Sequence, residues 1–218
     1  MPSVRLLSLL VLVTSTALAP SAHADGVAAP APPAVDLARF ERAGGRAIRS
    51  NGVPQGKVER YGHAEILVAA PLAAVRQQVT AYNGYRDLAP DKFSRSRVIA
   101  KENGETDVYM QAPLLKGLIV LWQVMRFSPV RALGPDSERV EGRYVRGNLK
   151  DANVIFTMKS VDARRTLLTI DLLVLPNMAV PQSMVDEELR DAAAIAVEAM
   201  REKAEGRGTP GAVASSSR

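Results

Sequence analysis

Side chains that could do chemistry are few in this chain. It has no Cys, which excludes disulfides, thiolate zinc sites and a cysteine nucleophile. It has two His residues, and His23 lies in a segment that we expect to be cleaved. His63 would need an ordered acid and a nucleophile to act as a general base, and its sequence neighbours indicate neither. We therefore expect no catalytic residue and no metal site.

Motifs for common reactions are also missing. The sequence contains no GxSxG, no HExxH, no phosphate-binding loop and no dinucleotide fingerprint. Hydrolytic, metal-assisted and nucleotide-dependent reactions are therefore disfavoured, and no cofactor is expected.

Three side chains could instead orient a bound molecule. Tyr144 has an inward position among aliphatic neighbours, where its hydroxyl either meets a ligand or bonds to the backbone. Trp122 either stacks on a flat ring or belongs to the core. Arg126 either faces an acidic or carbonyl group of a ligand or makes a surface ion pair. Asp87 and Asp91 follow the first main helix and are weaker binding candidates because loop acids are mostly solvated.

Length and composition favour one packed domain. The chain has 218 residues, of which 47% are hydrophobic and only 5% aromatic, so aliphatic side chains must fill the core. The net charge of +5 is too thinly spread for a nucleic-acid partner. The densest basic stretch is either a solvated face or a site of transient contact with a membrane surface. It comprises Arg39, Arg42, Arg46, Arg49, Lys57 and Arg60.

Both ends of the chain are typical of segments outside a domain. Arg5, an apolar run and Ala22-His23-Ala24 predict a signal peptide over 1–24. The run is shorter than the roughly 20 residues needed to span a bilayer, which favours cleavage and export to a periplasm or the medium. Residues 25–45 predict an Ala/Pro-rich linker and a short helix, 46–205 the domain, and 206–218 a flexible tail.

Strand and helix signals alternate between these ends. Alternating apolar residues and turn formers predict strands over 63–68, 94–100, 106–111, 118–127, 139–146, 152–160 and 166–175. Helical spacing after Pro71 predicts a short helix pair behind the first strand. A long amphipathic helix should begin at Pro181 and stop at Gly206, since acids occur early and bases late. The order predicts an α+β fold with a curved antiparallel sheet of about six to seven strands packed against this C-terminal helix.

The two-residue period separates the faces of the predicted strands. Phe156 and Met158 alternate with polar residues and should face the helix, as should Met110 and Leu172. For 118–127 the alternation is poorer. Placing Gln123 outside sends Trp122, Val124 and Arg126 inward.

This order of elements resembles the helix-grip superfamily of START lipid-transfer domains, polyketide cyclases and coenzyme Q-binding proteins. The resemblance rests on diffuse features between His63 and Ala204. They are Ala69-Ala70-Pro71 with Val75, Tyr82-Asn83-Gly84-Tyr85, Pro90, Arg165-Thr166-Leu167-Leu168-Thr169 and Pro181. The chain is thus identified as an exported bacterial member of this superfamily, whose fold implies an apolar cavity between sheet and terminal helix.

We expect this cavity to bind a hydrophobic small molecule or lipid without catalysis, in a volume of about 300 to 1,000 Å³. The expected lining residues are Met110, Trp122, Val124, Arg126, Tyr144, Phe156, Met158, Leu172, Leu189, Ala193 and Met200. Two alternatives stay open: a cyclase-like enzyme using Tyr144, Arg126 or His63 in one cavity, and a structural or stress-related protein whose alanines allow close packing and whose methionines fill the core. The sequence does not determine the oligomeric state.

Overall fold

The computed structural model describes residues 35–88, 93–114 and 119–207. The predicted signal peptide, residues 25–34 of the predicted linker, Asp91 and most of the predicted tail lie outside these residues. From Val35 onward the chain forms one compact unit.

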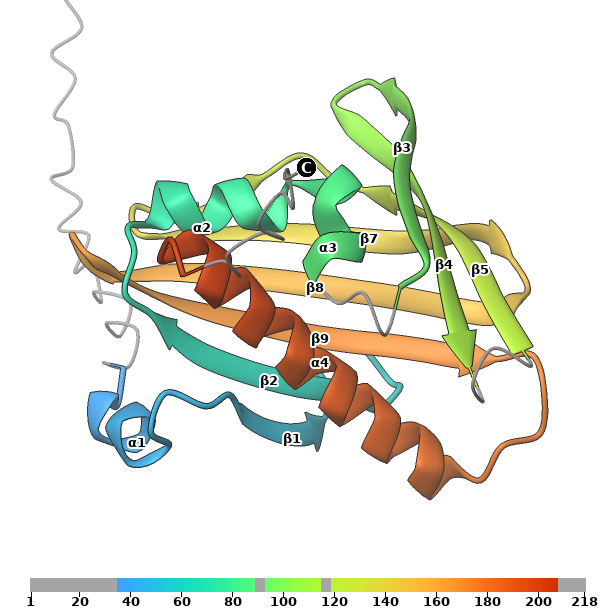
Figure 1. Ribbon diagram of the computed structural model, residues 1–218, viewed down its shortest axis with the longest axis horizontal. Coiled ribbons are helices and arrows are strands. Elements are labelled where there is room, and N and C mark those ends of the chain that lie inside the picture. The colour runs from blue at the N-terminus through green and yellow to red at the C-terminus, as the bar shows by residue number, and fades with distance from the viewer. Residues whose placement is uncertain (1–34, 89–92, 115–118, 208–218) are drawn as a thin grey trace, which may run out of the picture. The chain divides into compact units, whose positions relative to one another are not determined.

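One antiparallel sheet of nine strands dominates this unit (Figure 1). The strands run in the order β1-β2-β9-β8-β7-β5-β4-β3, and β6 pairs with β7. Their bounds are β1 Ile48–Gly52, β2 Tyr61–Val68, β3 Arg95–Glu102, β4 Glu105–Leu114, β5 Ile119–Phe127, β6 Arg131–Gly134, β7 Ser137–Gly147, β8 Leu149–Asp162 and β9 Arg165–Pro176. The sequence predicted only seven of them. Short β1 and fully exposed β6 lack a clear apolar period, and they form by pairing with β2 and β7.

The helices are α1 (Leu37–Arg42), α2 (Leu72–Val79), the 3-10 turn η1 (Tyr82–Gly84), α3 (Tyr85–Leu88) and α4 (Gln182–Ala204). Helices α2 and α4 pack on one side of the sheet. Pro71 and Pro181 directly precede α2 and α4, as predicted from the sequence. Proline lacks a backbone N–H, and the first residues of a helix do not need this group for an intrahelical hydrogen bond. Phe40 is the buried residue of α1. Gly206 adopts a positive φ just after α4, as is common at the end of a helix.

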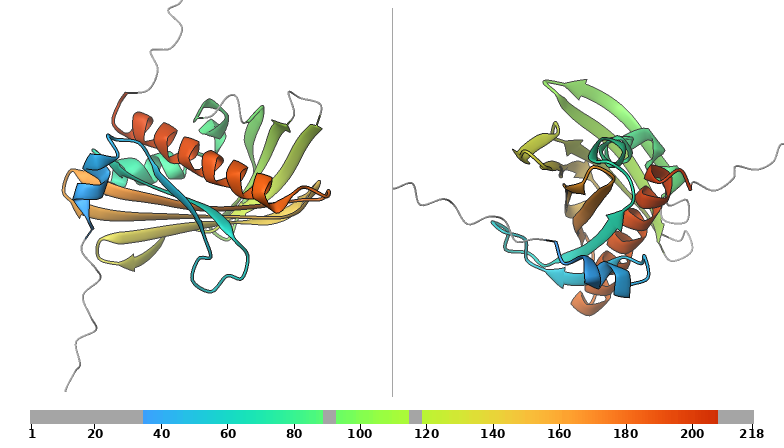
Figure 2. Two further views of the ribbon diagram at one scale, coloured as in Figure 1. Left: turned by 90° about the horizontal axis from the view of Figure 1, so that it is seen from below. Right: turned by 90° about the vertical axis from the view of Figure 1, so that its left-hand side faces the viewer.

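The sheet curves around α4, which crosses it diagonally and packs on β1, β2 and β9 (Figures 1 and 2). We call the sheet face toward α2 and α4 the inner face and the opposite one the outer face. The main core lies on the inner face, where Ile66, Met158, Leu168 and Val197 are fully buried. The observed α+β architecture agrees with the predicted helix-grip fold.

The predicted orientation of β5 is wrong. The β4–β5 register places Gln123 opposite buried Met110, and residues that pair across strands share a face. Gln123 therefore points inward, and its neighbours Trp122 and Val124 point outward. The prediction failed because it assigned the polar residue to solvent, whereas burial of Met125 and Phe127 fixes the opposite register. Arg126 consequently also lies on the outer face.

Candidate functional site

The inner face is not covered equally along its length. Half-buried apolar side chains lie at the edge of the core, on the strand segments away from the C-terminal end of α4. We call them the inner strip: Leu121, Tyr144, Leu172 and Val174. They come from β5, β7 and β9. Of these three strands, β9 is the one that packs against α4. An apolar surface of this kind, next to a core yet accessible, can hold an apolar ligand.

Gln123 supplies a polar atom next to this strip. Its Oε1 is buried and has no hydrogen-bond partner. On β5 it lies two residues from Leu121, on the same face of the strand. A buried acceptor without a partner is costly, and a ligand hydroxyl or amide can satisfy it. The sequence pattern assigned Gln123 to the outer face and therefore did not predict it as a ligand-binding residue, although a glutamine among apolar residues of one strand was a usable signal.

Tyr144 is held by the protein itself. Its hydroxyl donates a hydrogen bond to the carbonyl oxygen of Leu149 at 3.0 Å. Of the two expectations for Tyr144, a hydrogen bond to a ligand or one to the backbone, the structure shows the bond to the backbone. Its ring remains on the inner strip, where it can contact a ligand through its apolar surface.

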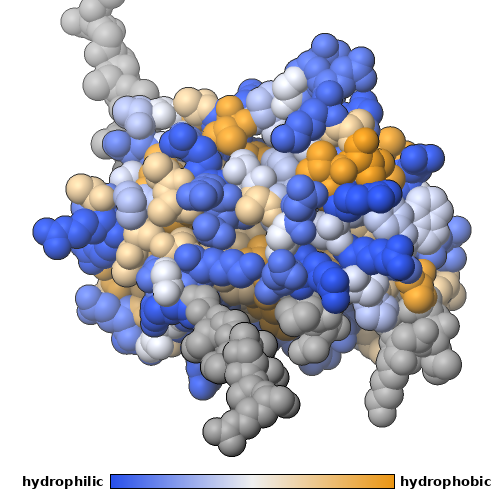
Figure 3. Space-filling view, turned by 45° about the horizontal axis from the view of Figure 1, so that its top comes forward, coloured by the Kyte–Doolittle hydropathy of each residue, from blue (hydrophilic) through white to orange (hydrophobic). Residues whose placement is uncertain are grey.

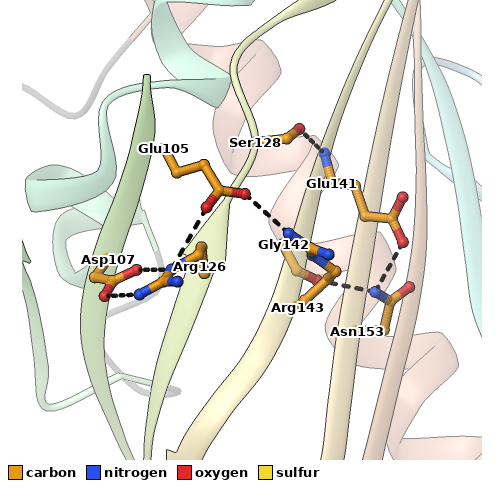
Figure 4. A network of polar contacts seen from close by, with 8 residues as sticks. All are labelled: Glu105, Asp107, Arg126, Ser128, Glu141, Gly142, Arg143 and Asn153. Atoms are coloured by element: carbon orange, nitrogen blue, oxygen red, sulfur yellow. Dashed lines mark hydrogen bonds and ion pairs between the residues drawn. The ribbon is translucent and has the colours of Figure 1, made fainter. Parts of the chain in front are cut away.

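Arg126 makes ion pairs on the outer face. Its Nε and one terminal nitrogen donate to both Asp107 oxygens, at 2.7 and 2.8 Å, and Glu105 lies 3.7 Å away (Figure 4). The hydrogen bond to Arg126 holds the pKa of Asp107 below its ordinary value. Arg143 extends this network through Glu105, so Arg126 has no part in an inner site.

A second polar network on the outer face is partly buried. The Tyr61 hydroxyl donates to Asn153 Oδ1 at 3.1 Å, and Asn153 Nδ2 donates to Glu141 at 3.1 Å and to the Gly142 carbonyl at 3.0 Å (the Asn153 bonds appear in Figure 4). Burial raises the pKa of Tyr61 to about 12. Burial would also raise the pKa of Glu141, but the hydrogen bonds from Lys57 and Asn153 outweigh it and lower that pKa.

His63 also lies on the outer face. Its Nδ1 lies 2.7 Å from Asp171 on β9, and Glu65 is 3.9 Å from its Nε2. The hydrogen bond to Asp171 raises the pKa of His63 against the opposing effect of burial. The structure thus gives His63 the acid that the sequence did not indicate. It does not bring His63 and Tyr144 together, because they lie on opposite faces of the sheet.

The surface carries hollows of moderate volume. About 450 Å³ lies between the η1 region and the β3–β4 and β5–β6 connections, and about 410 Å³ lies beside His63 and Asp171. A third, of about 280 Å³, lies at β3. Apolar side chains reach the surface in small patches among hydrophilic ones (Figure 3). None of these three hollows is lined by α4.

Comparisons with known proteins identify the fold. A STAR-related lipid transfer protein from Xanthomonas axonopodis aligns with a TM-score of 0.59 at 15% identity, covering 72% of this chain and 98% of its own. Human STARD10 aligns with a TM-score of 0.58 at 14% identity, covering 79% and 80%. A START superfamily protein from Mycobacterium smegmatis aligns with a TM-score of 0.55 at 15% identity, covering 66% and 96%. The chain has the START-like helix-grip fold. No family model matches the sequence, and no curated protein matches it either.

The terminal helix of this helix-grip fold contacts the sheet directly at Gly62, which lies against the backbone of Leu189. Most of the expected lining residues on the inner face are fully buried in the core. These are Met110, Phe156, Met158, Leu189, Ala193 and Met200. The small side chain of Ala193 is buried in the core cluster on the inner face. Leu172 and Tyr144 are the expected residues that stay half-buried on the inner strip.

The remaining expected residues have other roles in the helix-grip structure. Val124 is buried but lies on the outer face with Trp122 and Arg126. Asp87 is exposed in α3. In the described part of the chain, no group of three potential metal ligands occurs, and no helix is long and apolar enough to cross a membrane.

Proposed function

We propose that the chain binds a hydrophobic small molecule or a lipid on the inner strip, without catalysing a reaction. The observation that carries the proposal is the half-buried apolar surface of Leu121, Tyr144, Leu172 and Val174 beside the buried, unpartnered oxygen of Gln123. Such a surface favours a ligand with an apolar body and one hydrogen-bond donor.

Burial of the ligand supplies the binding free energy. Each Å² of apolar surface removed from water contributes about 25 cal/mol, so a chain or ring system that covers the strip gains several kcal/mol before the cost of immobilising it. Gln123 then fixes the orientation, because a ligand that leaves its Oε1 unpaired loses about 1 to 3 kcal/mol. Two proteins that share the fold, a START superfamily protein and a STAR-related lipid transfer protein, are consistent with this class of ligand.

A cyclase-like enzyme has no comparable support. The three residues proposed to share a cavity are divided between the two faces of the sheet, with Tyr144 inside and Arg126 and His63 outside. General acid–base catalysis requires the groups to reach one substrate.

The proposal is tested by binding of the fluorescent fatty alcohol cis-parinarol, which has an apolar chain and one hydroxyl donor, together with native mass spectrometry of the purified full chain. Leu121→Arg places a charge on the inner strip and should weaken probe binding by about tenfold or more, because the charge must be desolvated. Leu133→Arg is the matched control, since Leu133 is 53% exposed on β6. Arg126→Ala is a second control on the outer face.

Equal probe affinity for wild type and Leu121→Arg would contradict the proposed location. Failure of wild type to bind the probe, together with a native mass spectrum of empty protein only, would contradict the function itself. Circular dichroism and thermal unfolding of each variant separate these results from a loss of folding.

A further inference from the structure

Arginines and aromatic rings meet on the outer face at the free edge of the sheet. β3 is the edge strand, and its register with β4 places Arg97 opposite Tyr109 and Arg95 opposite Gln111. On the next strand, Trp122 pairs with the same Gln111. Because these pairs share one face, the cations of β3 lie beside the aromatic side chains of β4 and β5.

The arginines surround a hollow in the surface. Its volume is about 280 Å³, and it is lined by Arg86 from α3 and by residues of β3, β4 and the turn before them. The lining residues are Arg86, Ser94, Arg95, Ser96, Arg97 and Tyr109. The space suits an anionic group such as a phosphate, which arginine guanidinium groups bind through charged hydrogen bonds.

These arginines have no anionic partner within the described residues. Arg86, Arg95 and Arg97 make no ion pair or side-chain hydrogen bond there, and Arg95 and Arg97 are exposed. The basic stretch near the N-terminus differs, because most of its cations are already paired with acids. The pairs are Arg39–Glu65, Arg49–Asp191, Lys57–Glu141 and Arg60–Asp186. Among the described residues, the arginines of this hollow therefore keep a positive charge that no acid neutralises.

An exposed apolar surface adjoins this charge. The rings of Tyr109 and Trp122 are stacked with centroids 6.3 Å apart, and Trp122 is 37% exposed. Val120, which shares the outer face of β5, is 38% exposed. Tyrosine and tryptophan favour the boundary between lipid headgroups and acyl chains, where one part of the ring is apolar and another is hydrated.

We propose that this surface docks on a lipid bilayer that contains anionic lipids. Arg86, Arg95 and Arg97 receive the headgroup phosphates in the hollow, while Trp122 and Val120 enter the interfacial layer. Charge complementarity selects the anionic surface, and the aromatic stack beside it distinguishes a bilayer from a dissolved phosphate, which has no apolar part. This inference goes beyond the proposed function, because Arg95, Arg97 and Trp122 lie on the face opposite the inner strip, and Arg86 lines the hollow from α3 at the sheet edge.

Trp122 is the only tryptophan of the chain, so its fluorescence reports directly on this surface. The full chain is mixed with vesicles of phosphatidylcholine alone or of phosphatidylcholine with phosphatidylglycerol. Only the anionic vesicles should shift the emission to shorter wavelength and sediment with the protein. Brominated acyl chains should quench the emission, and added salt should weaken binding because it screens the charges.

Charge reversal locates the surface. One arginine contributes about fivefold to binding of an anionic membrane, so Arg95→Glu with Arg97→Glu should weaken vesicle binding well over tenfold. Arg42→Glu with Arg46→Glu is the matched control, since it makes the same charge change at exposed positions in the N-terminal basic stretch. Trp122→Ala should also weaken sedimentation with vesicles.

Several outcomes would overturn the inference. Equal loss in both double variants would mean that only net charge matters, and loss in the control alone would assign the membrane contact to the other stretch. A spectral shift with inorganic phosphate but none with vesicles would assign the hollow to a dissolved anion. Binding of cis-parinarol without vesicles is measured in parallel, so failure of docking is distinguished from failure of the proposed function.

Discussion

The backbone of Gly62 in β2 lies directly against the backbone of Leu189 in α4. A Cβ on Gly62 would overlap the carbonyl group of Leu189 and lie 2.6 Å from the backbone nitrogen of Arg190. Backbone atoms cannot move aside as a flexible side chain can. The absence of a side chain at residue 62 therefore sets how closely the terminal helix approaches the sheet.

Gly62→Ala should lower the free energy of unfolding by about 2 to 4 kcal/mol, because α4 must shift away from β2 and lose packing. Chemical denaturation measures this change. Gly52→Ala is the control, since a Cβ there meets no atom within 4 Å. A Gly62→Ala variant as stable as the control would show that α4 moves without cost.

Asn153 connects buried polar groups of β2, β7 and β8. Asn153→Ala should cost about 2 to 3 kcal/mol, because it leaves the Tyr61 hydroxyl and the Gly142 carbonyl without this partner. Tyr61→Phe removes one hydrogen bond and should cost about 1 kcal/mol. Urea unfolding compares the two variants, and the reverse order of their effects would contradict the network.

The His63–Asp171 pair predicts a pH dependence of stability. The pKa of His63 is raised above its ordinary value of 6.5, so the folded protein binds this proton more tightly than the unfolded chain. This contribution is fully present below pH 6.5 and is lost as pH rises through the folded pKa.

Asp171→Asn should lower the pKa of His63 and flatten this part of the stability profile. Proton NMR of the imidazole follows the pKa, with His63→Gln assigning the signal, and thermal unfolding follows the stability. Asp136→Asn is a control, because Asp136 is an exposed carboxylate near the β6–β7 turn. An unchanged His63 pKa in Asp171→Asn would exclude the hydrogen bond as the main cause.

Gln123→Met should stabilise the empty protein by about 1 kcal/mol, since it removes a buried acceptor that has no partner. The same variant should bind ligands with a hydroxyl donor less tightly while it still binds purely apolar ones. Gln77→Met on the exposed side of α2 should leave the stability near wild type. A destabilised Gln123→Met would mean that the protein itself satisfies this side chain.

The sequence by itself determined the chain order of seven of the nine strands described, the order of the main helices, and the start and end of α4. These features depend on local chemistry: Pro71 and Pro181 suit helix starts, Gly206 suits a stop, and the two-residue period of β8 separates Phe156 from its polar neighbours. Because this order of elements resembles that of the helix-grip superfamily, it also predicted the helix-grip fold.

The tertiary structure alone decided which face of β5 is inside and how closely α4 approaches the sheet. Both depend on partners that are distant in sequence, since Gln123 faces inward through its pairing with Met110, and Gly62 contacts Leu189 across 127 positions. A strand with mixed polarity has two nearly equal orientations, and only packing of Met125 and Phe127 against the core separates them. For the same reason the arginines of β3 and the ring of Trp122 form one surface only after the sheet is assembled.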